Sequence, residues 1–583
     1  MGYLEHLPQA ILRSICLHIP DCRAFALVCK SCVDPARSVL FATISITFYD
    51  TSELGHQAST WAKRLRLAKS LQYVRTIRIL DEDTHEPIGK FVECGDRLNE
   101  NWQYLPSDHP DRIVDEAAGW QALTGLISYL PGLKDFVYAG APQLHPNILQ
   151  CLEQKVPACR IHLETFCLRS LLRFPHQEIE VDPYEKKLAT HQQLYSVKLG
   201  RFDEYDDSGF FDYHLDALFD MVRGAAPGLR KVSMLREKPG SSMQLISSRR
   251  QTRQTWKENE LSVLPSSSKG KLRSLELAGP DSATLEALQG WSEVTAFENL
   301  EELKLHKHID AETSTWLVNT CSLELVSRLT VHPASIAIPA LFQKVGRLNE
   351  LKLVSNFDNV QLVDVLNRHG RTLRELAIIH PLSDSMNAAG IAEIVARLCP
   401  RLQKFCMRIP RTCGDAAEVR TYRSIGRIAR LRDLYLILDC RDANTSDNDD
   451  EGNPLNESIK HTLINHAIDA SLAKAIFETV ASSNPIPTAH LRLRRLEIRS
   501  QRNQTYGGLG RACAVLAGQW LCEKDEKDDR SGQVSVKRTR ALRVTDEKLT
   551  PLVAGVFHEL WPDEENTLHW SERWRSFPLR EAC

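Results

Sequence analysis

Residues 271–279 read KLRSLELAG, and residues 299–305 read NLEELKL. Both contain the phrase L-x-x-L-x-L, whose last two apolar residues are two positions apart, which is the period of a β-strand. Strong copies of this phrase start at residues 272, 300, 326, 348, 373, 402 and 431, so the intervals between them run from 22 to 29 residues. Weaker copies start at Val74, Leu133, Leu163, Leu194, Leu229 and Leu493.

Apolar residues at helical spacing separate these phrases. Ile391, Ile394, Val395 and Leu398, for example, precede the copy at Leu402. One strand and one helix cannot bury their apolar faces alone, but stacked units share a continuous core. The sequence therefore predicts an α/β solenoid with a parallel sheet. An ordinary α/β domain with leucine-rich strands is the competing interpretation.

The repeated phrase resembles that of leucine-rich repeat proteins over about residues 70–500. This resemblance implies a horseshoe, and the uneven intervals indicate an irregular one. Polar residues between and just after the apolar strand positions should then face its concave side, where a target protein would bind. The candidate target-binding residues are Glu302, Lys304, His306, Glu350, Lys352, Lys404, Arg408, Asp433, Tyr435, Arg495, Glu497 and Arg499. The alternative is that they are solvated strand residues.

The N-terminal stretch has a different pattern. Leu7, Ile11, Ile15 and Ile19 are four residues apart and predict one apolar helix face, with Pro8 in the first helical position. The sequence Pro20-Asp21 should end this helix, and Asp34-Pro35 should begin the third of three short helices.

These helices are similar to an F-box, and the similarity extends to F-box proteins of filamentous fungi. The family's phrase L-P-x-E-[IL]-L-x-x-I is followed, after a gap, by V-C-[KR]; here Ala10 replaces the acidic residue, and Val33 stands near the place of a frequent aromatic. The resemblance implies a site for the Skp-type adaptor of a cullin–RING ubiquitin ligase. The residues expected to bind the adaptor, or to pack beneath its site, are Leu7, Pro8, Ile11, Leu12, Ile15 and Val28.

The expected architecture is therefore an irregular leucine-rich repeat horseshoe preceded by a small three-helix, F-box-like segment. We expect an F-box-like segment at 1–45, a connecting region with the first irregular repeats at 46–130, a solenoid at 131–515 and a C-terminal cap at 516–583. Polar insertions are expected at 237–270 and 441–458. The C-terminal Trp561, Trp570 and Trp574 should pack against the last repeat.

Composition narrows the possible functions. A hydrophobic content of 43% excludes wholesale disorder, and a formal charge of −2 gives no support for a nucleic-acid or membrane partner. No secretion signal or long apolar run is evident, which favours a cytoplasmic or nuclear protein. The 16 cysteines should therefore be reduced, with Cys29 and Cys32 packing between helices.

Motifs for catalysis are missing from the sequence. It contains neither G-x-x-x-x-G-K-[ST] nor G-x-S-x-G, and His306 and His308 lack a third metal ligand nearby in the chain. We expect no enzyme activity, cofactor or metal. The expected function is that of a substrate-recognition subunit, which binds the adaptor through its F-box and an unknown target through its repeats. A repeat scaffold without a ligase role, whose N-terminal helices cap the solenoid, is the alternative.

Overall fold

The computed structural model divides the chain into two compact units, Met1–Leu325 and Val326–Cys583. It describes residues 4–19, 22–81, 117–140, 143–173, 180–199, 211–235, 261, 269–279, 283–333, 337–354, 359–379, 388–440, 456–485, 493–500, 507–524, 533–539, 549–562 and 570–580. The insertion expected at 237–270 lies outside these residues except for 261, 269 and 270. That expected at 441–458 also lies outside them, except that 456–458 begin a helix.

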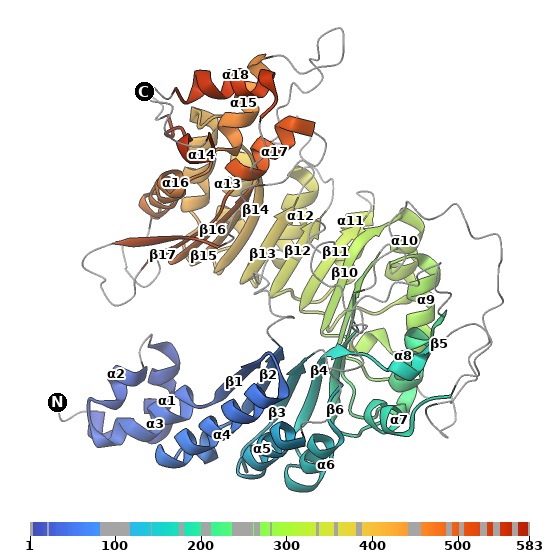
Figure 1. The fold of residues 1–583 in the computed structure, drawn as a ribbon. Coiled ribbons are helices and arrows are strands. Elements are labelled where there is room, and N and C mark those ends of the chain that lie inside the picture. The colour runs from blue at the N-terminus through green and yellow to red at the C-terminus, as the bar shows by residue number, and fades with distance from the viewer. Residues whose placement is uncertain are drawn as a thin grey trace. The chain divides into compact units, whose positions relative to one another are not determined.

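The first unit begins with three helices and continues with alternating strands and helices (Figure 1). Its elements are α1 (Gln9–His18), α2 (Cys22–Ala26), α3 (Lys30–Leu40), β1 (Thr43–Phe48), α4 (Thr51–Leu67), β2 (Thr76–Asp81), α5 (Ala117–Ser128), β3 (Asp135–Ala139), α6 (Pro146–Lys155), β4 (Arg160–Phe166), β5 (Leu172–Arg173), α7 (Pro183–Ala189), β6 (Leu194–Leu199), β7 (Phe211–Asp212), α8 (His214–Asp220), β8 (Lys231–Leu235), β9 (Ser274–Ala278), α9 (Leu285–Val294), β10 (Glu302–Ile309) and α10 (Ala311–Thr320).

The second unit continues the alternation and ends in a helical cluster. Its elements are β11 (Arg328–Pro333), α11 (Ile338–Lys344), β12 (Glu350–Val354), α12 (Asn359–His369), β13 (Glu375–Ile379), α13 (Ala388–Leu398), β14 (Lys404–Pro410), α14 (Ala416–Gly426), β15 (Asp433–Asp439), α15 (Asn456–His466), α16 (Ala470–Ser482), β16 (Arg495–Ser500), α17 (Gly507–Leu516), β17 (Gln519–Lys524), β18 (Val534–Arg538), α18 (Pro551–Leu560) and α19 (Trp570–Arg573).

Strands of the long sheet are neighbours in the order of the sequence, whereas β5 and β7 pair with each other in a separate two-stranded antiparallel sheet. The order in the first unit is β1-β2-β3-β4-β6-β8-β9-β10, and all these pairs are parallel. In the second unit β11 to β16 are parallel, and β17 and β18 extend the sheet antiparallel. Because parallel crossovers have one hand, the helices follow one face of the sheet in each unit (Figure 1).

The repeated phrase sets the register of these strands. Leu303 pairs with Leu275, and Leu305 pairs with Leu277. In the second unit one row runs through Leu329, Leu351, Leu376, Phe405, Leu434 and Leu496, all at most 1% exposed. The predicted α/β architecture with a parallel sheet is therefore confirmed, while the horseshoe stays a prediction.

Two local predictions were wrong. Leu163 does not start a phrase, because it pairs with Tyr138 and thus occupies the last apolar position of its strand. The third helix begins at Lys30 rather than at Pro35, which lies inside α3. Proline has no N–H to bond the carbonyl four residues earlier. The Gln9 side chain donates to that Ser31 carbonyl instead, at 3.2 Å, so a neighbouring helix satisfies the group.

The chain's end packs as the sequence predicts. Trp561 is 7% exposed in a cluster with residues of α15, α17 and α18, against which Trp570 and Trp574 pack. The indole of Trp561 donates to the Arg575 carbonyl at 2.9 Å, and the Ser576 hydroxyl donates to Asp469 at 2.6 Å. These contacts hold the C-terminal residues on the second unit.

The buried row of leucines should carry much of the second unit's stability. Replacing Leu351, which is 1% exposed, with alanine should lower the free energy of unfolding by about 2–5 kcal/mol through lost burial and a cavity. Denaturant unfolding of the full chain measures this change. Val360→Ala, at a side chain 68% exposed, is the control and should stay within about 0.5 kcal/mol of the parent. Equal effects would contradict the assignment.

Candidate functional site

The N-terminal helices enclose a very small core. Cys16, Cys22 and Ala36 are buried together, and Ile19, Phe25, Ala26 and Val39 pack against them as partly buried residues. Leu12 and Cys32 are also completely buried. A unit with so few buried residues leaves much of its apolar surface uncovered.

The six predicted adaptor-binding residues divide into three groups. Leu12 is 0% exposed, so it packs beneath any site rather than forming its surface. Leu7 and Ile15 are partly buried. Pro8 is exposed, and Ile11 and Val28 are each 48% exposed.

The sequence pattern missed the most exposed apolar side chain of the segment. Leu27, just after α2, is 87% exposed, and its neighbour Val28 continues the exposed stretch. The Gln9–Ser31 hydrogen bond holds the start of α1 against the start of α3, which follows these two residues directly. Pro8, Ile11, Leu27 and Val28 are named here the apolar patch. Leu27 could have been suspected because it falls between two short helices, where no apolar face covers it.

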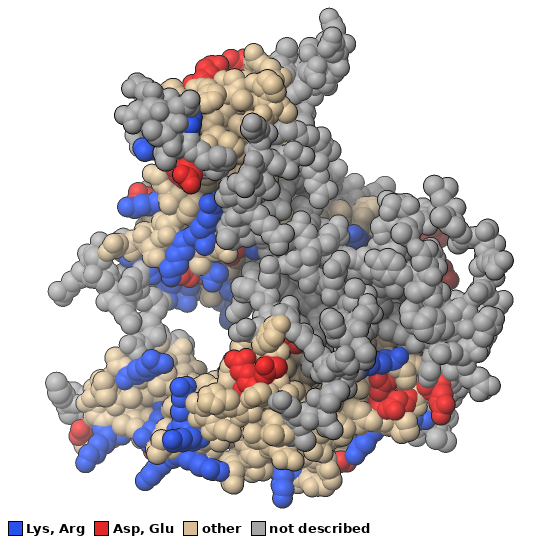
Figure 2. Space-filling model, in the orientation of Figure 1, with Lys and Arg blue, Asp and Glu red and all other residues tan. Residues whose placement is uncertain are grey.

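Basic side chains accompany the apolar patch. Arg13 and Lys30, two residues after Ile11 and Val28 in the chain, are exposed, and Arg37 makes a long 3.6 Å ion pair with Asp34. Figure 2 shows Lys and Arg gathered over the N-terminal helices and α4, with few acidic side chains on that part of the visible face. The surroundings of the patch therefore favour a partner with acidic side chains around an apolar centre.

The predicted target-binding residues lie on the polar face of the strands. In the second unit, one register row joins Glu350, Glu375, Lys404, Asp433 and Arg495 on successive strands. The structure thus brings the candidates of β12, β14, β15 and β16 onto one surface. Those of β10 lie on the corresponding face of the first unit, next to β9.

Most of these candidates are engaged in pairs with charged side chains of the same face. Lys404 pairs with Glu375 at 2.5 Å, and Arg408 pairs with Asp439 at 2.6 Å. Glu497 accepts ion pairs from Arg495 at 3.5 Å and from Arg499 at 3.0 Å. Glu302 is paired with Lys304 at 3.1 Å, and His306 lies 2.9 Å from Glu276. A ligand would therefore meet a row of neutralised charges rather than a single-charge surface.

Burial also changes the ionisation of Tyr435 and Asp433 on this face. Tyr435 is 5% exposed, and burial raises its pKa to about 12. Burial also raises the pKa of Asp433, although Lys404 and Arg495 act in the opposite direction. Tyr435 therefore leaves little surface for a ligand, whereas Asp433 is only partly buried.

Another cluster joins a serine, a histidine and an aspartate across three strands of the first unit. His162 Nδ1 lies 2.9 Å from Ser196 Oγ, and its Nε2 lies 2.9 Å from Asp135 Oδ1. Burial lowers the pKa of His162, so its neutral form is favoured. This side-chain order resembles that of nucleophilic catalysis. Sequence motifs could not reveal it, because the strand register creates it.

The rest of the geometry favours a structural role for this cluster. Arg160 binds both oxygens of Asp135, at 2.7 and 2.9 Å, so the carboxylate is already neutralised. The adjoining strands pair in the sheet ladder, which engages their backbone amides and leaves them unsuited to serve as an oxyanion hole. Ser196, His162 and Asp135 thus connect three strands, like the ion pairs farther along this face.

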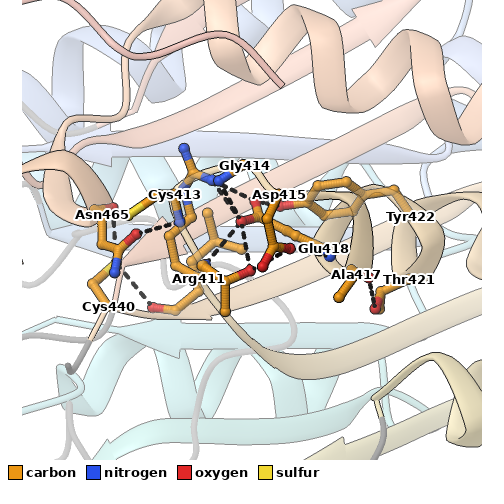
Figure 3. Close-up of polar contacts among 12 residues, drawn as sticks. Arg411, Cys413, Gly414, Asp415, Ala417, Glu418, Thr421, Tyr422, Cys440 and Asn465 are labelled. Carbon is orange, nitrogen blue, oxygen red and sulfur yellow. Dashed lines mark hydrogen bonds and ion pairs between the residues drawn. The ribbon is translucent and has the colours of Figure 1, made fainter. Parts of the chain in front are cut away.

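A second polar cluster is buried between β14 and α14 (Figure 3). Arg411 Nη1 lies 2.5 and 2.7 Å from the two oxygens of Glu418, and the Tyr422 hydroxyl donates to Glu418 at 2.7 Å. Both ion-pair side chains are 0% exposed. The backbone amides of Thr412 and Gly414 also donate to Glu418, each at 2.9 Å. This network fixes the loop that joins the strand to the helix.

The loop needs unusual backbone conformations. Cys413 and Gly414 have φ angles of 56° and 72°, and a side chain at Gly414 would approach the backbone of Pro578 and Leu579. Asn465 accepts from the Cys413 amide at 2.8 Å, and the Arg580 amide donates to the Gly414 carbonyl at 2.7 Å. The cluster therefore ties the C-terminal residues to the sheet.

Comparisons with known proteins do not assign a class beyond this architecture. Neither the protein-family models nor the curated proteins gave a match. No group of three or more metal-ligating side chains occurs among the described residues. Within the same residues, no helix is both long and apolar enough to cross a bilayer. The fold itself defines an α/β protein of repeated strand–helix units.

Acid should lower the free energy of unfolding of the first unit by protonating Glu276. Burial alone would raise its pKa, but hydrogen bonding to His306 and the charge of Lys304 lower it to about 2. Because the folded pKa lies below the ordinary 4.5, the stabilisation is complete above pH 4.5 and is lost as the pH falls towards 2. The change corresponds to roughly 3 kcal/mol. Denaturant unfolding between pH 6 and 3 should show a shallower loss for Glu276→Gln than for the parent. The exposed-site variant Glu324→Gln is the control, and an unchanged slope for Glu276→Gln would contradict the assignment.

Removing one charge of the buried Arg411–Glu418 ion pair should lower the free energy of unfolding more than removing both charges. Glu418→Gln leaves the Arg411 charge uncompensated and should cost about 3–5 kcal/mol of unfolding free energy. Arg411 Nε and Nη2 already lack hydrogen-bond partners among the described residues. The double variant Arg411→Met, Glu418→Gln removes the uncompensated charge and keeps an oxygen that can accept from the Thr412 and Gly414 amides, so it should recover part of the loss. Glu478→Gln breaks an exposed 3.8 Å pair with Lys474 and should change little in the same assay. A double variant as unstable as Glu418→Gln would refute this view of the pair.

Proposed function

We propose that this protein is the substrate-recognition subunit of a cullin–RING ubiquitin ligase, and that the apolar patch binds the Skp-type adaptor. The observation that carries the proposal is the exposure of Leu27, Ile11 and Val28 on an F-box-like segment. Fully burying one such side chain is worth about 1.5–3 kcal/mol. A partner that covers several of them gains enough to offset part of the cost of association.

The repeats would supply the target-binding surface in this proposal. A repeat array presents one long face, and here that face carries paired charges and partly buried polar groups on successive strands. A target protein would be selected by the match to this pattern rather than by net charge. Catalysis would belong to other subunits of the ligase, so this chain contributes proximity and orientation. The complex would act in the cytoplasm or the nucleus.

The apolar patch can be tested with the full chain and a purified Skp-type adaptor. The double variant Ile11→Asp, Val28→Asp places two charges at side chains that are each 48% exposed. Adaptor recovery in co-precipitation should fall at least about tenfold, because the charges would have to be desolvated at the interface. The melting temperature of the repeats should stay within a few degrees, since neither residue belongs to a buried core.

The matched control is Leu67→Asp, at an apolar side chain of α4 that is 77% exposed and outside the patch. It should bind adaptor like the parent. Equal recovery by the double variant and the parent would refute adaptor binding at the patch. Adaptor recovery that survives deletion of residues 1–41, which removes the three helices and leaves β1 intact, would refute the whole F-box assignment.

The same deletion separates the proposal from a repeat scaffold whose N-terminal helices are a cap. Under the scaffold hypothesis, removal of residues 1–41 lowers the melting temperature of the repeats, and neither protein binds the adaptor. Under the proposed function, the deletion abolishes adaptor binding, and the repeats stay folded by circular dichroism.

A further inference from the structure

Two cysteines meet at the edge of the apolar patch. Cys29 is the residue just before α3, and Cys32 lies in its first turn. Their sulfur atoms are 3.3 Å apart. Disulfide formation would need these atoms to approach to about 2.05 Å, a movement that side-chain rotation within a Cys-x-x-Cys turn can provide.

The two thiols differ in accessibility. Cys32 is 0% exposed, whereas Cys29 is partly exposed and directly follows Val28 of the apolar patch. Burial, and next the hydrogen bond with Cys29, raise the pKa of Cys32 to about 11. Cys29 is therefore placed to react first with a reagent from solution, and Cys32 to react second.

We propose that Cys29 and Cys32 form a reactive dithiol that a small-molecule disulfide, such as oxidised glutathione, converts to an intramolecular disulfide. The Cys29 thiolate attacks one sulfur of the reagent, forms a mixed disulfide and releases one glutathione thiolate. The Cys32 thiolate then attacks Cys29 Sγ and releases the second. Two electrons pass from the cysteine pair to the reagent, and the two thiol protons end on two molecules of glutathione.

The regulatory part of this inference rests on the proposed function. If an adaptor covers Val28, it also shields the adjoining Cys29 sulfur, so bound adaptor should slow the first step. Because adaptor binding and oxidation of the dithiol are thermodynamically linked, oxidation should in turn weaken adaptor binding. The dithiol would then make docking sensitive to the thiol–disulfide balance of its surroundings.

Other cysteines provide an internal comparison. Cys16 and Cys22 are both buried in the same small core, where the Cys22 thiol donates to the Cys16 carbonyl at 3.0 Å. Cys399 is 1% exposed, in the second unit. Burial raises the pKa of its thiol to about 12. These thiols should stay reduced under conditions that oxidise the Cys29–Cys32 pair.

The sequence allows a direct test by mass spectrometry. The full chain is incubated with oxidised glutathione, quenched in acid, alkylated and digested with trypsin. Cleavage after Arg23, Lys30 and Arg37 puts Cys29 in the peptide AFALVCK and Cys32 in SCVDPAR. The expected product is this pair of peptides joined, with a mass lower by two hydrogens than the sum of the reduced forms. Formation of the joined product should quicken from pH 7 to pH 9 as more Cys32 ionises.

Two variants complete the test. Cys32→Ala should stop at the glutathione adduct on Cys29, and Cys29→Ser should leave the buried Cys32 in SCVDPAR without an adduct. Three results would each contradict the proposed dithiol. They are a glutathione adduct on Cys29 of the parent that never forms the disulfide, a disulfide from Cys32 to Cys16, and oxidation of the pair no faster than that of Cys399.

Adaptor binding is measured separately, so that the two proposals can fail independently. Saturating adaptor should slow the formation of the joined peptides at least about fivefold, and the oxidised parent should recover less adaptor than the reduced one. Cys29→Ser should bind adaptor equally with and without the oxidant. If the disulfide forms but no adaptor binds under any condition, the proposed function fails and the dithiol stands. If the adaptor binds but leaves the oxidation rate unchanged, the regulatory part fails.

Discussion

The architecture depends on parallel strands that stack with their apolar positions side by side, although the register shifts between β4 and β6. Each strand presents two apolar residues to the helices, and these residues become buried because the next strand places its own pair beside them. A single unit of 22–29 residues could not remove this surface from water. The stability of every unit is thus shared with its neighbours, and the uneven spacing of the phrase is absorbed in the connections rather than in the sheet.

The same register determines the chemistry of the opposite face. Side chains two positions apart on one strand stand beside their counterparts on the next, so opposite charges and hydrogen-bonding groups meet at regular places, as at Lys404 and Glu375 or at His162 and Ser196. These contacts satisfy the polar layer internally. The N-terminal helices are the contrasting case, because their small core leaves Leu27 and Val28 in water. That contrast is the reason for placing the adaptor there.

The sequence predicted the sheet well, because the phrase combines a strand period with a nearly constant interval. The repeated phrase located the apolar strand residues from Leu275 to Ile498. The N-terminal pattern selected Ile11 and Val28, and both side chains are exposed. Adaptor and target binding stay predictions. The sequence did not predict those local features that depend on residues far away in the chain. The start of α3 depends on an amide from Gln9, and the charge pairs depend on which strands become neighbours. Neither is written in a local pattern.

The hydrogen bonds between residues 576–580 and the rest of the second unit have a consequence for synthesis. Asp469 accepts from the Ser576 hydroxyl, and the Gly414 carbonyl accepts from the Arg580 amide. In each case the donor is synthesised more than a hundred residues after the acceptor, so the hydrogen bond forms late. A polypeptide emerging from the ribosome can stack its strands in order as they appear. These contacts form only after residues 576–580 have emerged. A product that terminates early would display an unsealed apolar end, which is the kind of surface that chaperones and proteases recognise.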